Sequence, residues 1–153
     1  MYQRILFASD GSPASDNALK EAVKLAQAGA ELRVLTVVPD PLAHFVSPYG
    51  MAYDAGPVRN AAIESGRAAL EATVAKLSAQ GVKATGELLD LTETASTNIA
   101  AALLEEAKSW PADLIVMGTH GRRGVRRFFL GSVAEELARC SPLPLLLVRG
   151  QED

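Results

Sequence analysis

Apolar residues occur in short, nearly unbroken runs that alternate with longer segments in which they recur every three or four positions. The runs cover residues 4–8, 32–38, 82–89, 113–117 and 144–148. Such runs are typical of strands that are buried on both faces of a parallel sheet. The longer segments carry apolar stripes with helical spacing: residues 13–29, residues 58–79, a segment that starts at Ser96 or Thr97, and residues 132–140. Gly86 interrupts the third run and predicts a weaker strand there.

Strands and helices that alternate in this order predict a single α/β domain over residues 1–153. We expect an open, parallel, five-stranded, Rossmann-like sheet with helices on both faces and right-handed crossovers. Residues 39–57 carry four prolines and no periodicity, which predicts a long variable loop. Ligands of such sheets bind at the carboxyl ends of strands, where the strand order reverses. The first and fourth strands end in polar, glycine-bearing turns, which we therefore expect to face each other.

Composition excludes several classes of function. The chain is 48% hydrophobic but only 5% aromatic, and its net charge is −3, so nucleic acid is not an expected partner. No apolar run approaches the ~18 residues of a membrane span, and no export leader is visible, so we expect a cytoplasmic protein without a membrane partner. The single cysteine, Cys140, excludes an internal disulfide, and we expect its thiol to be packed.

The glycine-rich segment after the fourth run is the main candidate for chemistry. Gly118-Thr-His-Gly121 follows the run directly, and Gly131-Ser132 stands at the start of the next helix. A loop of this kind can surround a phosphate with backbone N–H groups and a helix N-terminus. The spacing also fits an ordinary surface connection before a capped helix, because Ser132-Val-Ala-Glu135 matches a capping box. The phosphate motif G-x-x-x-x-G-K-(S/T) is absent.

Four segments together resemble the universal stress protein family, over nearly the whole chain except residues 39–57. They are residues 5–12, 113–121, 130–135 and 145–149. Members of that family that bind ATP carry the motif G-x2-G-x9-G-(S/T), which matches Gly118, Gly121, Gly131 and Ser132 here. The resemblance implies the adenine-nucleotide alpha hydrolase-like variant of the fold, with the strand order 3-2-1-4-5 and with ATP and Mg²⁺ as ligands. It also implies a homodimer through the last strand, residues 144–148, an edge that would otherwise be exposed.

The resemblance further implies a role for each matching position. Asp10 would contact the ribose or a metal ion bound to the phosphates, and it is the one candidate metal ligand. The backbone of Val38 would read the adenine edge, and the N–H of Val133 would hold the terminal phosphates together with Ser132. The other positions implied to line the nucleotide are Ala8, Ser9, Met117, Gly118, His120, Gly121, Arg122 and Gly131.

Several of these positions have plainer alternatives, which the residues alone leave open. Asp10 also suits an Asx turn or a cap of the first helix, and Val38 suits a strand-end core position. Arg122 belongs to a basic cluster with Arg123, Arg126 and Arg127 that either neutralises the triphosphate or points into solvent.

The sequence does not identify a catalytic base, so the function it predicts is nucleotide-dependent regulation in a stress response. The resemblance allows slow hydrolysis or self-phosphorylation on Ser12, Thr119 or Ser132. One alternative is a nucleotide-using enzyme of the ATP pyrophosphatase or adenylyl transferase type. Such enzymes would carry S-G-G-x-D-S after the first strand, where this chain has Ser9-Asp-Gly-Ser-Pro13. Another alternative is a dimeric interaction module that binds no nucleotide.

Overall fold

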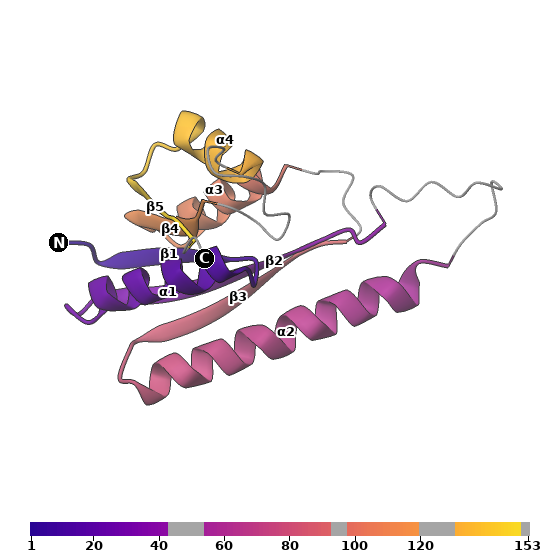
Figure 1. The fold of residues 1–153 in the computed structure, drawn as a ribbon, viewed down its shortest axis with the longest axis horizontal. Coiled ribbons are helices and arrows are strands. Elements are labelled where there is room, and N and C mark those ends of the chain that lie inside the picture. Colours follow the sequence, from indigo (N-terminus) through magenta and orange to yellow (C-terminus); the bar gives the residue numbers. More distant parts are fainter. Residues whose placement is uncertain (43–53, 93–97, 120–130, 151–153) are drawn as a thin grey trace.

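The computed structural model describes residues 1–42, 54–92, 98–119 and 131–150. Its elements, in chain order, are β1 (Arg4–Ser9), α1 (Pro13–Ala26), β2 (Glu31–Pro39), α2 (Gly56–Ala79), β3 (Ala84–Leu91), α3 (Ile99–Ser109), β4 (Leu114–Gly118), α4 (Ser132–Cys140) and β5 (Leu145–Val148). The strands form one parallel sheet in the order β3-β2-β1-β4-β5 (Figure 1). The predicted fold class and strand order are confirmed.

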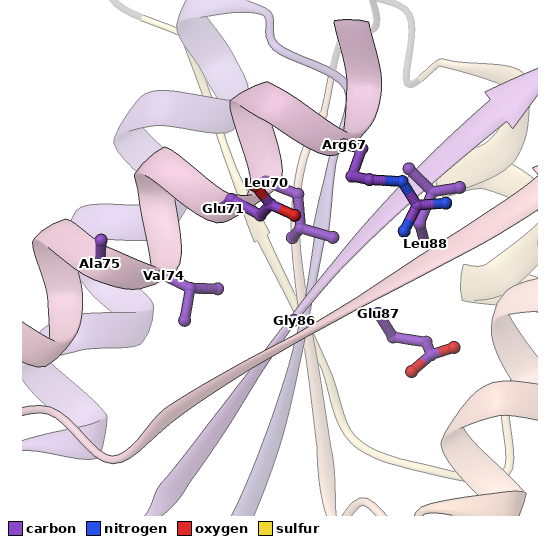
Figure 2. A pocket seen from close by; sticks show the side chains of 8 residues that line it. All are labelled: Arg67, Leu70, Glu71, Val74, Ala75, Gly86, Glu87 and Leu88. Atoms are coloured by element: carbon purple, nitrogen blue, oxygen red, sulfur yellow. The ribbon is translucent and has the colours of Figure 1, made fainter. Parts of the chain in front are cut away.

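Helix α2 runs along β2 and β3 at one edge of the sheet (Figures 1 and 2). Gly86 does not interrupt β3, which pairs with β2 from Ala84 to Leu91. A Cβ at Gly86 would lie 3.0 Å from Cγ of Leu70 and 3.0 Å from Cγ2 of Val74. Glycine therefore stands in this strand because the helix packs closely against its backbone.

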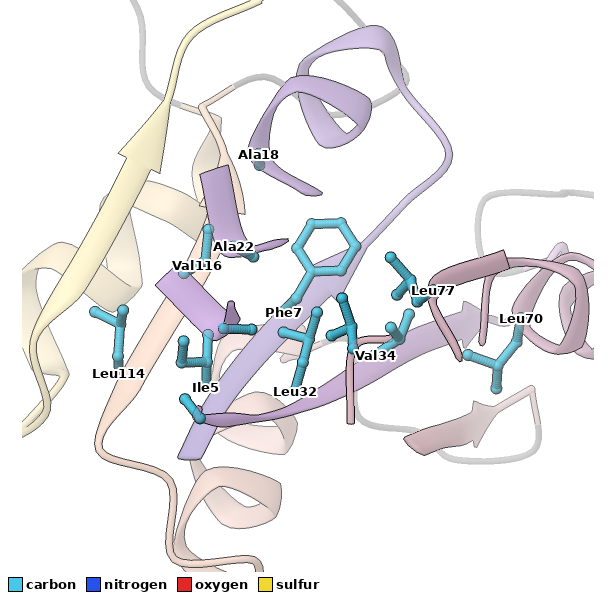
Figure 3. Close-up of a cluster of buried hydrophobic side chains, with 13 residues drawn as sticks. Ile5, Phe7, Ala18, Ala22, Leu32, Val34, Leu70, Leu77, Leu114 and Val116 are labelled. Atoms are coloured by element: carbon cyan, nitrogen blue, oxygen red, sulfur yellow. The ribbon is translucent and has the colours of Figure 1, made fainter. Parts of the chain in front are cut away.

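Two apolar clusters fill the two faces of the sheet. Ile5 and Phe7 of β1 point to the face covered by α1 and α2, where Figure 3 shows them with Ala18 and Ala22. Leu6 points to the opposite face and belongs to a second cluster with residues of α3 and α4. Because neighbouring side chains of a strand alternate between faces, a strand buried on both sides must be apolar at every position. This requirement explains the unbroken apolar runs.

Capping residues and a proline set the helix starts, which differ from the predicted ones for α2 and α3 but not for α1. Helix α1 starts after Ser12, whose Oγ accepts a hydrogen bond from the N–H of Ser15 at 3.1 Å. Helix α3 starts after Asn98 instead of at Ser96 or Thr97, because Oδ1 of Asn98 accepts from the N–H of Ala101 at 2.9 Å. Helix α2 includes Pro57, since a proline is tolerated in the first turn of a helix.

Cys140 is exposed, so the expectation of a packed thiol is wrong. It is the last residue of α4, and the buried side chains of that helix are Ala134 and Leu137, further toward its start. None of the helices in the described residues combines the length and the apolar character that crossing a membrane requires.

Candidate functional site

The strand order reverses between β1 and β4, and their carboxyl ends form the candidate site. The two strands are parallel neighbours, with Ala8 paired to Met117. The chain leaves β1 toward β2 on one side of this pair and leaves β4 toward β5 on the other. Diverging connections of this kind leave a crevice at the carboxyl ends of the strands. The structure thus brings together the ends of the two strands that carry Ala8, Ser9, Met117 and Gly118.

The turn between β1 and α1 is ordered by its own side chains. Oδ1 of Asp10 accepts a hydrogen bond from the N–H of Ser12 at 2.9 Å, which is an Asx turn. Gly11 has a φ of +76°, a backbone conformation that glycine adopts without strain. The hydroxyl of Ser15 lies 3.4 Å from that of Ser9. The Asx-turn alternative for Asp10 is confirmed, while the cap of α1 is Ser12.

Gly118 has a structural reason to be glycine that its motif does not reveal. A Cβ at this position would lie 2.8 Å from the backbone carbon of Ala14 and 2.9 Å from Cβ of Ala14. The end of β4 therefore packs directly against the first turn of α1. This contact alone requires glycine at the strand end, whatever occupies the crevice.

The two ends of the glycine motif are joined by a backbone hydrogen bond. The N–H of Gly131 donates to the carbonyl of Thr119 at 2.6 Å, and the N–H of Thr119 donates to the carbonyl of Val148 at 2.9 Å. The start of α4 is thereby held beside the end of β4. His120, Gly121 and Arg122, as well as the other three arginines of the cluster, lie outside the described residues.

The start of α4 differs from the predicted capping box. Its N-cap is Gly131, with an extended ψ of 153°, and Ser132 is already the first helical residue, so the cap assigned to Ser132 is wrong. No side chain caps this helix. The first N–H groups of any helix have no acceptor inside it, and here they include those of Ser132 and Val133. Such groups, together with the helix dipole, favour an anion.

Val38, at the end of β2, is a core residue. It is 5% exposed, and a Cβ on Gly66 of α2 would lie 2.9 Å from its Cγ2. The strand-end core alternative for this residue is confirmed. The side chain faces α2, so only the backbone of Val38 remains for contact with a ligand.

Two carboxylates, one just after β2 and one near the end of β3, were not predicted from the sequence. Asp40 accepts from the N–H of Leu42 at 3.0 Å and pairs with Arg59 of α2, with 3.3 Å between Oδ2 and Nη2. The Leu42 N–H and then the Arg59 guanidinium lower the pKa of Asp40. Asp90 accepts from the hydroxyl and the N–H of Thr92, which lower its pKa. An aspartate in a turn after a strand is a local sequence signal for such a hydrogen bond to the N–H two residues later. The pairing of Asp40 with Arg59, 19 positions away, has no local sequence signal.

The described part of the chain holds no group of three or more histidine, cysteine, aspartate or glutamate residues that could bind a metal ion. Asp10 is therefore not part of such a group within the described part of the chain. Any metal ion at Asp10 would take its remaining ligands from water and from a nucleotide, as Mg²⁺ commonly does.

The fold is that of a doubly wound α/β protein whose topological switch point lies between β1 and β4. The chain belongs to the universal stress protein family, because the model of that family matches residues 1–149. A universal stress protein of Bacillus subtilis is 33% identical over 97% of this chain and 100% of its own length. One from Methanocaldococcus jannaschii is also 33% identical, over 97% of this chain and 83% of its own length.

Solved structures show the same fold. A protein of the universal stress protein family from Burkholderia pseudomallei is 34% identical, with a TM-score of 0.75 over 96% of each chain. A universal stress protein in complex with cAMP is 23% identical, with a TM-score of 0.57 over 98% of this chain and 99% of the other. The one from Archaeoglobus fulgidus in complex with dAMP is 19% identical, with a TM-score of 0.64 over 96% and 98%. At these last two identities the likeness concerns the fold alone.

Proposed function

We propose that this protein binds ATP in the crevice between β1 and β4 and acts as a cytoplasmic, homodimeric regulator in a stress response. The observation that carries the proposal is the backbone hydrogen bond between Gly131 and Thr119. It holds the N-terminus of α4, which no side chain caps, beside the end of β4 and next to β1, which Asp10 follows directly. The nucleotides in the two structural relatives, cAMP and dAMP, support an adenine nucleotide as the class of ligand.

In this proposal the triphosphate lies beside Gly131, which has no side chain to exclude it, and against the N–H groups of Ser132 and Val133 at the positive end of the helix dipole. Ala8, Ser9, Met117 and Gly118 form the floor, and the backbone of Val38 contacts the adenine. Asp10 contacts the ribose or a Mg²⁺ ion that arrives with the nucleotide. His120, Gly121 and Arg122 complete the site.

Chemistry at this site is proposed to be slow at most. Of the three hydroxyl residues considered for self-phosphorylation, Ser12 and Thr119 are each 5% exposed, whereas Ser132 is exposed. Ser12 also accepts the hydrogen bond that caps α1. Any self-phosphorylation is therefore expected on Ser132, which lies in the first turn of α4 beside the proposed phosphates.

The homodimer is proposed to form through β5, with residues 1–153 as one domain in each copy. β5 pairs with β4 on one side only and lies at the edge of the sheet. Its residues Leu145–Val148 are all apolar and none is fully buried. An apolar, uncharged edge strand is a template for pairing with a second copy. Light scattering at micromolar concentration should report a dimer, and a monomer would contradict this part of the proposal.

Calorimetric titration with Mg²⁺–ATP, ADP and cAMP tests the site. We expect Gly131→Val to abolish binding of ATP, because the side chain would enter the phosphate space. Asp10→Ala should weaken binding at least tenfold if the carboxylate contacts the ribose or the metal ion. Asp16→Ala is the matched control, because Asp16 is an exposed carboxylate in the first turn of α1. Equal affinity in all four proteins would refute the site.

The same preparations separate the proposed regulator from the alternative functions. Steady turnover at ~1 per second or faster would indicate a nucleotide-using enzyme instead. The absence of binding of any adenine nucleotide to a folded wild-type dimer would indicate an interaction module.

A further inference from the structure

A groove lies at the opposite edge of the sheet from β5, between α2 and β3. It has a volume of about 590 Å³ (Figure 2). Its apolar floor includes Leu70 and Val74 of α2 and Leu88 of β3. Three charged residues, Arg67, Glu71 and Glu87, stand on its rim, and none of them makes an ion pair with another described residue.

The backbone of β3 is open along this groove. β3 pairs with β2 on one side and is the last strand of the sheet. The N–H of Leu32 in β2 donates to the carbonyl of Lys83 at 2.9 Å, so the backbone groups of Lys83 face β2. Since backbone groups alternate in direction along a strand, those of Gly86 and Leu88 face the open edge.

The side chains around this edge define what would fit there. Leu88 faces α2 and the apolar floor, whereas Glu87 points away from α2 on the other side of the strand (Figure 2). An added strand that pairs with Gly86 and Leu88 would place every second side chain over the apolar floor. The side chains between them would lie beside Glu87. We infer that this edge binds an extended segment of a partner protein with alternating apolar and basic residues, which adds a strand to β3.

Charge distinguishes this occupant from a second copy of the chain. Two antiparallel β3 strands paired about their centre would place Glu87 opposite the Glu87 of the second copy, and directly opposed like charges are destabilising. β5, by contrast, contains no charged residue. The two edges of the sheet therefore suit different partners.

The probe for this site is a short peptide of alternating valine and lysine, acetylated and amidated at its ends and labelled for fluorescence anisotropy. We expect it to bind the wild type, and we expect Glu87→Lys to weaken binding about tenfold by replacing an attraction with a repulsion. Glu64→Lys is the matched control. It makes the same change of charge at an exposed position of α2 that does not line the groove, and it should leave affinity within about twofold.

Two further measurements separate strand addition from general attraction to an acidic protein. A peptide with proline in place of the central valine should not bind, because proline cannot donate to the strand ladder. Hydrogen exchange at the N–H groups of Gly86 and Leu88 should slow at least tenfold when the valine–lysine peptide is bound. Equal affinities of the Glu87→Lys and Glu64→Lys variants, or unchanged exchange at these two groups, would overturn the inference. So would a wild-type oligomer that dissociates on Glu87→Lys, because the occupant would then be a second copy.

Discussion

The N–H of Gly131 donates a 2.6 Å hydrogen bond to the carbonyl of Thr119, and this bond closes the segment between β4 and α4 at its base. Gly131 is the N-cap of α4 and has a φ of −57°. That value lies within the range of proline, so a substitution can remove the donor and leave the local backbone unchanged.

We therefore expect Gly131→Pro to lower the free energy of unfolding by about 1 kcal/mol relative to Gly131→Ala, which keeps the N–H. Urea denaturation of the two variants without nucleotide measures this difference. If the proline variant is as stable as the alanine variant, the hydrogen bond does not hold the two ends of the motif together.

Gly118→Ala tests the contact between the end of β4 and α1. The new Cβ would lie 2.8 Å from the backbone carbon of Ala14, which cannot move aside without shifting the helix. We expect a loss of about 1–3 kcal/mol in the free energy of unfolding, typical of overpacking. Gly150→Ala is the control, because its Cβ would meet Cβ of Ala14 at an ordinary 3.5 Å. Equal stability of both variants would show that α1 does not approach β4 this closely.

The glycines show which features of the fold and the candidate site the sequence can predict and which it cannot. The apolar runs predict the strands of a parallel sheet because burial on both faces leaves a continuous signal at every strand position, whereas the strand order came from the family resemblance. A glycine, however, marks only that a Cβ is excluded and not what excludes it. Gly118 must be glycine because Ala14 lies against it, and Gly86 because Leu70 lies against it. The glycine motif instead assigns Gly118 to ligand binding, and the apolar run is interpreted as interrupted at Gly86.

The polar contacts were missed for a different reason. Arg33 and Glu106 are separated by 73 positions and Arg59 and Asp40 by 19, and neither pair lies in a local pattern that a single sequence displays. The start of α4 at Ser132 matches the prediction, but the capping-box pattern assigns the N-cap to Ser132 instead of Gly131, because both residues are acceptable N-caps. Only the backbone conformation decides between them.

The ion pair between Arg33 of β2 and Glu106 of α3 is expected to stabilise the packing of α3 on the sheet. Nη1 of Arg33 lies 2.8 Å from Oε1 of Glu106, and the guanidinium lies 4.7 Å from the ring centre of Trp110. Nε of Arg33 is buried without a hydrogen-bond partner among the described residues. Removing the carboxylate would therefore leave a largely buried cation with Trp110 alone.

We expect Glu106→Ala to lower the free energy of unfolding by about 1.5–3 kcal/mol, the range for hydrogen bonds to charged groups. Glu105→Ala is the control at the exposed neighbouring position, where the change should stay within about 0.5 kcal/mol. Thermal and urea unfolding of both variants measure the two costs. Similar losses in both would show that the Arg33 contact contributes nothing beyond helix propensity.

Asp40 and Arg59 join the end of β2 to the first turns of α2, and their pairing should appear in the acid titration of the protein. The Leu42 N–H and the Arg59 guanidinium hold the pKa of Asp40 below its ordinary value. A carboxyl whose pKa is lower in the folded than in the unfolded chain stabilises the fold above the unfolded pKa of about 3.9. This contribution is lost as the pH falls through the lower, folded value.

The free-energy difference between the wild type and Asp40→Asn should accordingly be constant above about pH 5 and shrink as the pH falls below about 4. Arg59→Gln should raise the pKa of Asp40 toward its ordinary value, as followed by NMR of the carboxyl carbon. Arg67→Gln, further along the same helix, should leave that pKa unchanged, because Arg67 lines the groove beside β3 and does not contact Asp40. An unchanged Asp40 titration in Arg59→Gln would mean that the Leu42 N–H alone holds the carboxylate and that Arg59 does not fasten α2 to β2.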